Sequence, residues 1–472
     1  MNTHKTDFGS NQLRAVLLSS MLLLFISGGI FSQKVWNLEE CINHALENNI
    51  RIKQSILEVE ASEIGVKESW LDMLPSANAG ASQSFGWGRS LDQSTYDFVD
   101  QETQQSYFNL SSDVTLFSGF QKQNTMRQRR AEYMASKYNA DKMRNDISLT
   151  VASYYLQILF SRELVNNAKN QLEVTRQQID RTRRLVDAGT LPRGSLLEIE
   201  AQEANEKVSL VQAENQLNLA YLDLMQLLEL SAGSDFEIEM PELVVENDPQ
   251  LLPVQTIYNR ALDIMPEIKT AEYNVIRNER ALAVAKGARS PNLGMSASLG
   301  TNYSDQIRYL DPLDPKFMEV KSFEDQMTDN RSTTLSLRLN IPIFNGYQIS
   351  SYVNRSKLNL MNADYSLELA HNDLRKNVET AYADAVAAYA SFNARQQSLK
   401  SLNEAFHYTE ERFNVGMVNA VDYNVAKNQL NRAESELLSG KFDYIFKLKI
   451  LDFYLGRSLT LQDMQAFRES ED

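Results

Sequence analysis

The sequence has few of the residues that interrupt helices or build catalytic and metal sites. Cysteine occurs once, at Cys41, which excludes a disulfide within the chain. The four histidines are scattered, and no Cys/His metal spacing, glycine-rich phosphate loop or nucleophile elbow is present. The net charge of −15 argues against nucleic acid as a partner. We therefore expect no catalytic residues, no cofactor and no metal site.

Long apolar runs are also missing, except near the N-terminus. Residues 15–31 are apolar, follow Lys5 and Arg14, and have small residues beyond their core, as in a secretory signal peptide. We expect residues 1–33 to be such a signal, with a membrane anchor as the alternative. A lipid anchor at Cys41 is disfavoured, because Leu-Glu-Glu precedes it where small residues are needed. No other run approaches the ~20 residues of a spanning helix, so we expect an exported protein.

Proline is absent from three long stretches, 120–191, 193–240 and 343–472. Because proline inside a helix costs about 3 kcal/mol, these stretches are candidates for unusually long helices. Turns at Gly189 and Gly416 would fold them into hairpins, and the first arm, 120–187, would be ~100 Å long. Apolar residues recur there at the seven-residue spacing of coiled coils. Examples are Leu172, Ile179, Val186, Leu437, Tyr444 and Leu451.

Several sequence landmarks occur twice, in the same order. "LFSGF" (116–120) and "IFNGY" (343–347) are 227 residues apart. "HALENNIRIK" (44–53) and "RALDIMPEIK" (260–269) are 216 apart, so the second copy has 11 extra residues in between. Such residues are tolerated most easily in a loop between strands.

This repetition indicates an internal duplication. We expect a first repeat at 38–230, a linker at 231–256, a second repeat at 257–456 and a tail at 457–472. In each repeat, a leading helix, such as 50–74, and the short second arm of the hairpin would stack end to end along the long arm. The linker would cross at their joint.

Four stretches alternate between apolar residues and small polar ones, as β-strands with one polar face do. They are ~76–87, ~107–117, ~292–303 and ~332–343. Their length suits tilted membrane strands, and a soluble sheet with one buried face is the alternative. The membrane interpretation is favoured because no apolar helix face remains to cover them and the other face is Ser, Asn and Gly. The intervening stretches, 88–106 and 304–331, are expected to be loops.

Four strands cannot close a barrel, and unpaired strand edges are not tolerated in lipid. Several chains must then share one barrel. Two would supply eight strands and a filled interior, whereas three would supply twelve and leave room for water. The alternating pattern by itself does not determine the number of subunits. Gly119 and Gly346 would give the backbone freedom needed where strand turns into helix.

The chain at this point resembles the outer-membrane efflux (TolC) family over nearly its whole mature length. The resemblance rests on "ALENNIRIK"/"ALDIMPEIK", "LFSGF"/"IFNGY", "LVDAGTL"/"FNVGMVNAVDYNVAKNQL" and the closing "LDFYLG". It implies a mainly α fold with membrane β: a homotrimer with a 12-stranded barrel in the outer membrane of a Gram-negative bacterium and an α-helical tunnel in the periplasm.

The same resemblance implies a passive exit duct for efflux or type I secretion. Its partners would be a periplasmic adaptor (membrane-fusion) protein and an inner-membrane pump of RND, ABC or MFS type. Two alternatives remain open: a trimeric coiled-coil stalk with a small outer-membrane anchor, which would conduct nothing, and a secreted enzyme, which the missing site residues disfavour. The cargo is not identified by the sequence.

The resemblance also implies a gate at the periplasmic hairpin tips. Asp422 falls on a family acid position, where three copies would form an acidic ring with raised pKa values and an affinity for cations. Val425 occupies the next acid position and Ser195 the first-copy counterpart, while Val418 and Phe413 replace the linking Arg and Tyr, so the gate is either acidic or apolar. The adaptor would dock at two groups of tip residues: Gly189, Thr190 and Leu191, and Gly416, Met417 and Val418.

Overall fold

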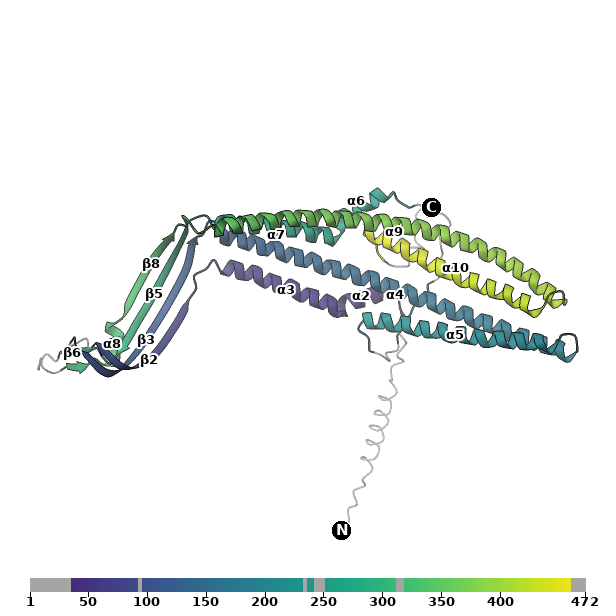
Figure 1. Cartoon of the computed structure of the whole chain (residues 1–472), viewed down its shortest axis with the longest axis horizontal. Helices are drawn as coiled ribbons and strands as arrows, with labels where there is room; N and C mark the ends of the chain where they lie inside the picture. The colour runs from purple at the N-terminus through teal and green to yellow at the C-terminus, as the bar shows by residue number, and fades with distance from the viewer. Residues whose placement is uncertain (1–34, 92–95, 232–235, 242–250, 311–317, 460–472) are drawn as a thin grey trace, which may run out of the picture.

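A computed structural model describes residues 35–91, 96–231, 236–241, 251–310 and 318–459 of the chain. The expected signal peptide, 1–33, and most of the tail, 457–472, lie outside these residues. Figure 1 shows an elongated molecule in which a small sheet occupies one end and long helices run from it to two turns at the other end.

Two helices of 67 residues each dominate the fold, α4 (Gln121–Asp187) and α9 (Gln348–Asn414). At ~1.5 Å per residue each is ~100 Å long, as the proline-free stretches predicted. Each turns back into a shorter partner, α5 (Arg193–Leu227) after α4 and α10 (Ala420–Leu455) after α9. Residues at seven-residue spacing form the buried stripes, among them Leu172, Ile179, Tyr444 and Leu451.

Each half begins with two consecutive helices rather than the single leading helix expected from the sequence. They are α2 (Leu38–Asn48) and α3 (Ile50–Leu71) in the first half, and α6 (Val254–Ile264) and α7 (Pro266–Gly287) in the second. Asn49 explains the first break: its side-chain oxygen caps the N-H of Arg51 at 2.9 Å, and its amide donates to Leu227 O at 2.9 Å. This contact joins the start of α3 to the end of α5, so the two stack end to end along α4.

The largest apolar core lies at this joint, around the middle of α4. Two short strands pair in parallel there, β1 (Val35–Trp36) and β4 (Glu237–Ile238). The Tyr155 hydroxyl donates to the carbonyl oxygen of Glu239 at 2.8 Å and holds this segment against α4. The described part of the linker therefore crosses the bundle where α3 and α5 meet.

One antiparallel sheet has the strand order β2-β3-β5-β8. Its strands are β2 (Asn78–Leu91), β3 (Phe98–Phe117), β5 (Asn292–Ser304) and β8 (Ser332–Asn340). The expectation of a loop at 88–106 was wrong. Polar residues in this range belong to β3, which pairs with β2 as far as Phe98 opposite Leu91. The alternating pattern does not extend to these residues, so it underestimated both strands.

The expected loop at 304–331 was also wrong. It contains β6 (Arg308–Leu310), β7 (Met318–Val320) and the short helix α8 (Phe323–Asp329). The Phe323 ring packs against Phe108 and Tyr303, with ring centroids 6.4 and 5.3 Å apart. A helix thus covers the far end of the apolar face, contrary to the expectation that none would. Nearer the long helices, Leu335, Leu337 and Leu339 stay 69, 67 and 60% exposed.

Both corners between strand and long helix have two successive residues in the left-handed region. These are Gly119 (φ 61°) with Phe120 (φ 60°), and Gly346 (φ 59°) with Tyr347 (φ 67°). The surroundings differ: a Cβ on Gly119 would lie 2.4 Å from the carbonyl oxygen of Gly287, whereas one on Gly346 would meet nothing within 4 Å. The first corner therefore has a steric need for glycine that the second lacks. No membrane-spanning helix is found among the residues that the structure describes.

The two corners form a matched pair for mutation. We expect Gly119→Ala to destabilise the protein more than Gly346→Ala. Both variants add left-handed strain of about 1 kcal/mol, but only the first adds overpacking against Gly287, which costs about 1–3 kcal/mol. Thermal unfolding of the detergent-solubilised proteins, followed by circular dichroism, checks this. Equal losses in the two variants would contradict the close contact at the first corner.

Candidate functional site

The two hairpin tips lie at the end of the molecule opposite the sheet (Figure 1). Gly189 (φ 76°) and Gly416 (φ 79°) take the left-handed conformation that closes each turn, and a Cβ on either would meet nothing within 4 Å. The N-H groups of Thr190 and Met417 donate back to Leu185 O (2.9 Å) and Arg412 O (2.8 Å), which satisfies the last carbonyls of α4 and α9. Both tips are thus ordered turns with open surfaces, and Met417 is 72% exposed.

An apolar cluster joins the two hairpins just behind these turns. Its buried members come from all four helices: Ile179, Ile199, Phe413, Ala420 and Tyr423. The Tyr423 ring lies 4.8 Å from that of Phe413 and 5.4 Å from that of Phe406. Burial raises the pKa of Tyr423 to about 12, so its hydroxyl stays neutral. This cluster holds the tip of one hairpin against the other.

The structure separates the residues that the sequence assigned to a gate. Phe413 is buried in the apolar cluster, and Val418 packs against it. Asp422 and Val425 are instead exposed on α10, with Val425 51% accessible. Ser195 is half-buried in the first turn of α5, where its N-H donates to Pro192 O at 3.1 Å. Within one chain, then, only Asp422 and Val425 form an open surface.

A buried polar cluster follows the apolar one along the hairpins. Glu206 of α5 accepts a hydrogen bond from the Thr175 hydroxyl of α4 at 2.5 Å and lies 3.4 Å from the Lys427 ammonium of α10. Lys427 also donates to the Thr175 hydroxyl. Burial lowers the pKa of Lys427, and the Glu206 carboxylate opposes this shift. The cluster links two hairpins whose residues are more than 220 positions apart in sequence.

A polar groove of about 470 Å³ opens beside this cluster, between α4, α5 and α10. Amide side chains dominate its lining: Asn167, Gln171, Gln202, Asn205, Asn428 and Asn431. Gln202 donates to Asn428 across the groove at 2.9 Å. The contact between the hairpins is therefore polar in its middle and apolar at both ends, where the tip cluster and the central core lie.

Sequence reasoning missed Tyr423, Glu206 and Lys427, although a signal was present. The seven-residue series through Leu451, Tyr444 and Leu437 reaches Leu430 and Tyr423 when it is continued backwards. Glu206 lies seven residues after the buried Ile199, so it is a charged residue at an apolar position of the repeat. A carboxylate and a lysine, each within such a stripe, could have suggested a buried pair.

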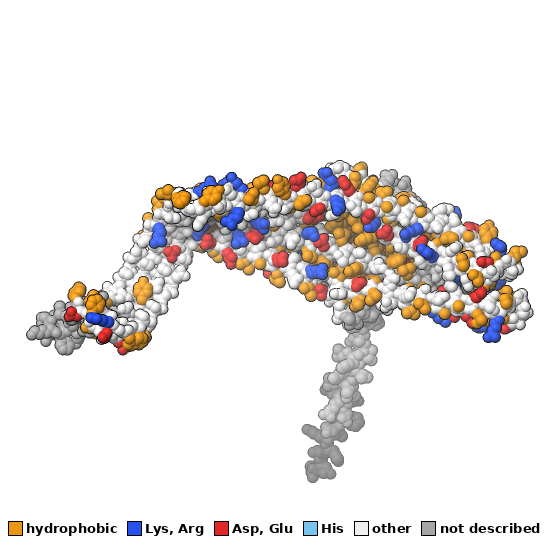
Figure 2. Space-filling view, viewed as in Figure 1, with side chains coloured by type: hydrophobic (Ala, Val, Ile, Leu, Met, Phe, Trp, Pro, Cys, Tyr) orange, Lys and Arg blue, Asp and Glu red, His pale blue; other side chains and the backbone are white. Residues whose placement is uncertain are grey.

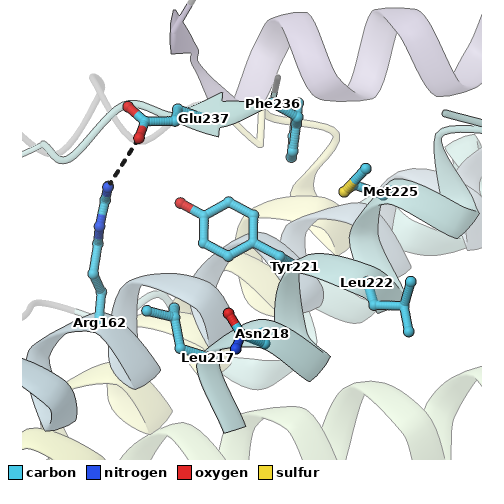
Figure 3. A pocket seen from close by; sticks show the side chains of 8 residues that line it. All are labelled: Arg162, Leu217, Asn218, Tyr221, Leu222, Met225, Phe236 and Glu237. Carbon is cyan, nitrogen blue, oxygen red and sulfur yellow. Dashed lines mark ion pairs between the residues drawn. The ribbon is translucent and has the colours of Figure 1, made fainter. Parts of the chain in front are cut away.

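A second hollow, of about 340 Å³, lies between α4, α5 and the segment of β4 (Figure 3). Leu217, Leu222, Met225 and Phe236 give it an apolar lining. Arg162 and Glu237 form an ion pair of 3.8 Å beside the Tyr221 ring. The pair ties β4 to α4. Within the described ranges, no group of three His, Cys, Asp or Glu side chains is arranged to hold a metal ion.

Two long helical hairpins attached to a small sheet with one exposed apolar face are the architecture of an outer-membrane efflux channel protein. The chain belongs to the outer membrane efflux protein family, whose family model matches residues 41–229 and 257–457. This confirms the resemblance found in the sequence and places the protein in the outer membrane.

Individual relatives are distant but cover most of the chain. Outer membrane protein TolC of Escherichia coli (strain K12) is 22% identical over 464 residues, which cover 96% of this chain and 89% of the relative. Outer membrane efflux protein BepC of Brucella suis is 24% identical over 333 residues, covering 70% and 67%.

Solved structures with the same fold include CusC and MtrE. The CusC structure has a TM-score of 0.75 at 16% identity and covers 91% of this chain and 96% of CusC. The open state of the Neisseria gonorrhoeae MtrE outer membrane channel has a TM-score of 0.70 at 19% identity and covers 90% of each chain. These matches confirm the predicted fold of a single TolC-like subunit.

The buried pair between the hairpins generates a prediction. Glu206→Gln should leave the Lys427 charge buried without a counter-charge, at a local cost of about 3–5 kcal/mol. Hydrogen exchange of α10 around residues 423–430 should then accelerate about a hundredfold or more, because 1.36 kcal/mol corresponds to a factor of ten.

Glu214→Gln is the matched control on α5. It removes the surface carboxylate that lies 3.7 Å from Lys169, an exposed pair worth only about 0–1 kcal/mol. A double replacement of Glu206 and Lys427 by methionine should restore slow exchange. Identical exchange in Glu206→Gln and Glu214→Gln would contradict a tightly coupled buried pair.

Proposed function

We propose that the protein is the outer-membrane exit duct of a multicomponent efflux or type I secretion system and works passively, without catalytic residues. The observation that carries this proposal is that one subunit ends in unpaired edges on both of its long sides. A closed wall then requires further copies of the chain.

One edge of the subunit consists of β2, α3 and α5, and the opposite edge consists of β8 and α9. In the sheet, β2 and β8 are the outer strands. In the half next to the sheet, α3 contacts α4, α4 contacts α7, and α7 contacts α9. In the half next to the tips, α5 contacts α4, α4 contacts α10, and α10 contacts α9. Strand edges and helix edges thus lie on the same two sides of the molecule.

Each helix edge carries an apolar stripe that has no partner in the described chain. On α3 it comprises Ile50, Leu57, Ile64 and Leu71 at seven-residue spacing, between 42 and 62% exposed. On α9 it comprises Leu358, Met361, Tyr365 and Leu369, between 51 and 63% exposed. Figure 2 shows hydrophobic side chains along the edge formed by α9. Apolar residues at steps of seven, or of three and four, form the seams of coiled coils.

Pairing one edge with the opposite edge of the next copy is a head-to-tail contact, and such contacts form a ring where the rotation between copies closes. Three copies give twelve strands, enough for a barrel with a water-filled interior, whereas the eight strands of two copies would enclose mainly side chains. The polar face of Ser, Asn and Gly would line the lumen and the apolar face would meet outer-membrane lipid. We therefore infer a homotrimer with a periplasmic helical tunnel, built from repeats at 38–230 and 257–456 with a linker at 231–256 and a tail at 457–472.

At the periplasmic end, we propose that exposed Asp422 and Val425 from three copies line the gate, with Ser195 nearby in the first hairpin. Phe413 and Val418 would act indirectly, because the apolar cluster of which they are part positions α10. Gly189 to Leu191 and Gly416 to Val418 would receive a periplasmic adaptor, which joins an inner-membrane pump. Relatives with names such as "Toluene efflux pump outer membrane protein TtgF" support a pump partner.

The ring can be tested at its edges. Leu57→Glu on α3 and Leu358→Glu on α9 should each prevent assembly, because a charge would enter the same subunit contact from either side. Both residues are more than 60% exposed in the single subunit, so its own fold should lose no more than ~0.5 kcal/mol. The neighbouring exposed changes Glu58→Gln and Lys357→Gln are controls.

Native mass spectrometry should detect three copies of the unmodified protein, and planar bilayers should show its conductance. Both signals should be lost in the two glutamate variants. An assembled protein without conductance would indicate a stalk rather than a duct.

The tip can be tested at Gly416. Gly416→Arg should abolish export while assembly is retained, because a large charged side chain would disturb the adaptor surface. Gly416→Asn is the control, since asparagine tolerates the left-handed backbone. Complementation of a deletion strain in a toxin-sensitivity assay measures export. Normal export by an assembled Gly416→Arg variant would argue against docking at this tip.

A further inference from the structure

Helix α8 lies on the same face of the sheet as the exposed leucines. Phe108 is opposite Thr301, and Leu110 is opposite Leu299, so these four side chains share one face. Phe323 of α8 packs on that face between Phe108 and Tyr303. In the proposed barrel this is the outer face, and α8 would then lie outside the lumen.

Hydrogen bonds fix α8 to the edge of β5. Strand β8 pairs with β5 only as far as Ser332 opposite Gly300. Beyond this point the fully buried Gln326 side chain accepts from the N-H of Ser304 and donates to its carbonyl oxygen, both at 2.9 Å. The Asn330 amide donates to Asn302 O at 2.7 Å. Side chains of α8 and its C-cap thus satisfy edge groups that β8 does not reach, so the position of α8 is well defined.

The exposed surface of α8 is apolar in one place and acidic elsewhere. The Phe323 ring is 50% exposed although it also contacts the sheet. Glu324, Asp325 and Asp329 are exposed as well. An aromatic ring next to carboxylates is suited to a boundary between an apolar phase and water, and to neither phase alone.

The position of α8 matches the expected thickness of the lipid belt. At the other end of the same sheet, the corners expose Phe120, Phe344 and Tyr347 by 63, 89 and 63%. From Leu293 to Tyr303 there are ten residue steps, or ~34 Å along an antiparallel strand. At the usual barrel tilt of about 45° this gives ~24 Å, close to the ~25 Å apolar band of membrane barrels, which has an aromatic girdle at each end.

We propose that α8 is an interfacial helix that contacts the outer-leaflet boundary through Phe323 and thereby sets the depth of the sheet in the membrane. Its carboxylates remain in water, and the strand residues beyond it, such as 99–106 of β3, project outside. The outer-membrane location and the continuous apolar face favour lipid as the occupant. This inference rests on the proposed barrel. It also assigns a role to the longer strand connection of the second half.

The test places a single tryptophan probe at the helix. Trp36, Trp70 and Trp87, the three tryptophans of the chain, are replaced by phenylalanine, and Phe323→Trp is added to the otherwise complete protein in phosphatidylcholine vesicles. The lipid is brominated either near the headgroup or at mid-chain. We expect the shallow bromines to quench the new fluorescence at least twofold more than the deep ones. Thr328→Trp, on the exposed side of the same helix, should not be quenched.

Phe344→Trp, at the opposite boundary, separates this inference from the barrel on which it rests. If lipid bromines quench Phe344→Trp but not Phe323→Trp, α8 faces water or another subunit and the proposal is overturned, while the barrel stands. If they quench neither, the barrel itself is contradicted. Stronger quenching of Phe323→Trp by deep bromines would also overturn the interfacial position.

Discussion

The packing of α4 against several helices at once determines the arrangement of the whole chain. This helix contacts α3 and α7 next to the sheet and α5 and α10 next to the tips. It can do so because none of its 67 residues is proline, so its hydrogen-bond ladder is continuous. Helices α3 and α5 need only be long enough together to cover it. The sheet at one end and the turns at the other are thereby held in a fixed relation across ~100 Å.

The two hairpins are joined by contacts of two different kinds. The central core and the tip cluster are apolar, and separating them would expose hydrocarbon to water at ~25 cal/mol per Å². The section with Glu206 and Lys427 is polar and adjoins a groove lined by amides. Water that enters this section can replace the hydrogen bonds between the amides. Burying the charge of Glu206 or Lys427 without the other would still cost folding free energy. The hairpins are therefore held most strongly at the ends of their contact and most specifically in its middle.

Much of this fold could be predicted from the sequence because its signals are long and local. The missing prolines predicted α4 and α9 closely, and the alternation of Leu335, Leu337 and Leu339 predicted an apolar strand face. The outer parts of β2 and β3 could not be predicted, since Asp100, Gln101 and Glu102 form strand only because a partner strand satisfies their backbone. Helix α8 was missed for a similar reason: it is seven residues long and depends on tertiary contacts of Phe323 and Gln326.

The candidate site was harder to predict than the fold. Glycine at 189 and 416 could be placed from the turn chemistry alone. The neighbours of Phe413 and Asp422 could not, because heptad spacing assigns residues to one face of a helix without saying which other helix that face meets. Tyr423, next to the exposed Asp422, is buried because α4, α5 and α9 converge on it.

The burial of Cys41 has a practical consequence for experiments on this protein. Its side chain is fully enclosed between α2 and the central core, and burial, with a smaller effect from Glu40, raises its pKa to about 12. A thiolate is the nucleophile that attacks maleimide and methanethiosulfonate reagents, so the only native thiol, which stays protonated, should be unreactive at neutral pH. Spin labels and fluorophores could then be attached to introduced cysteines without removing the natural one.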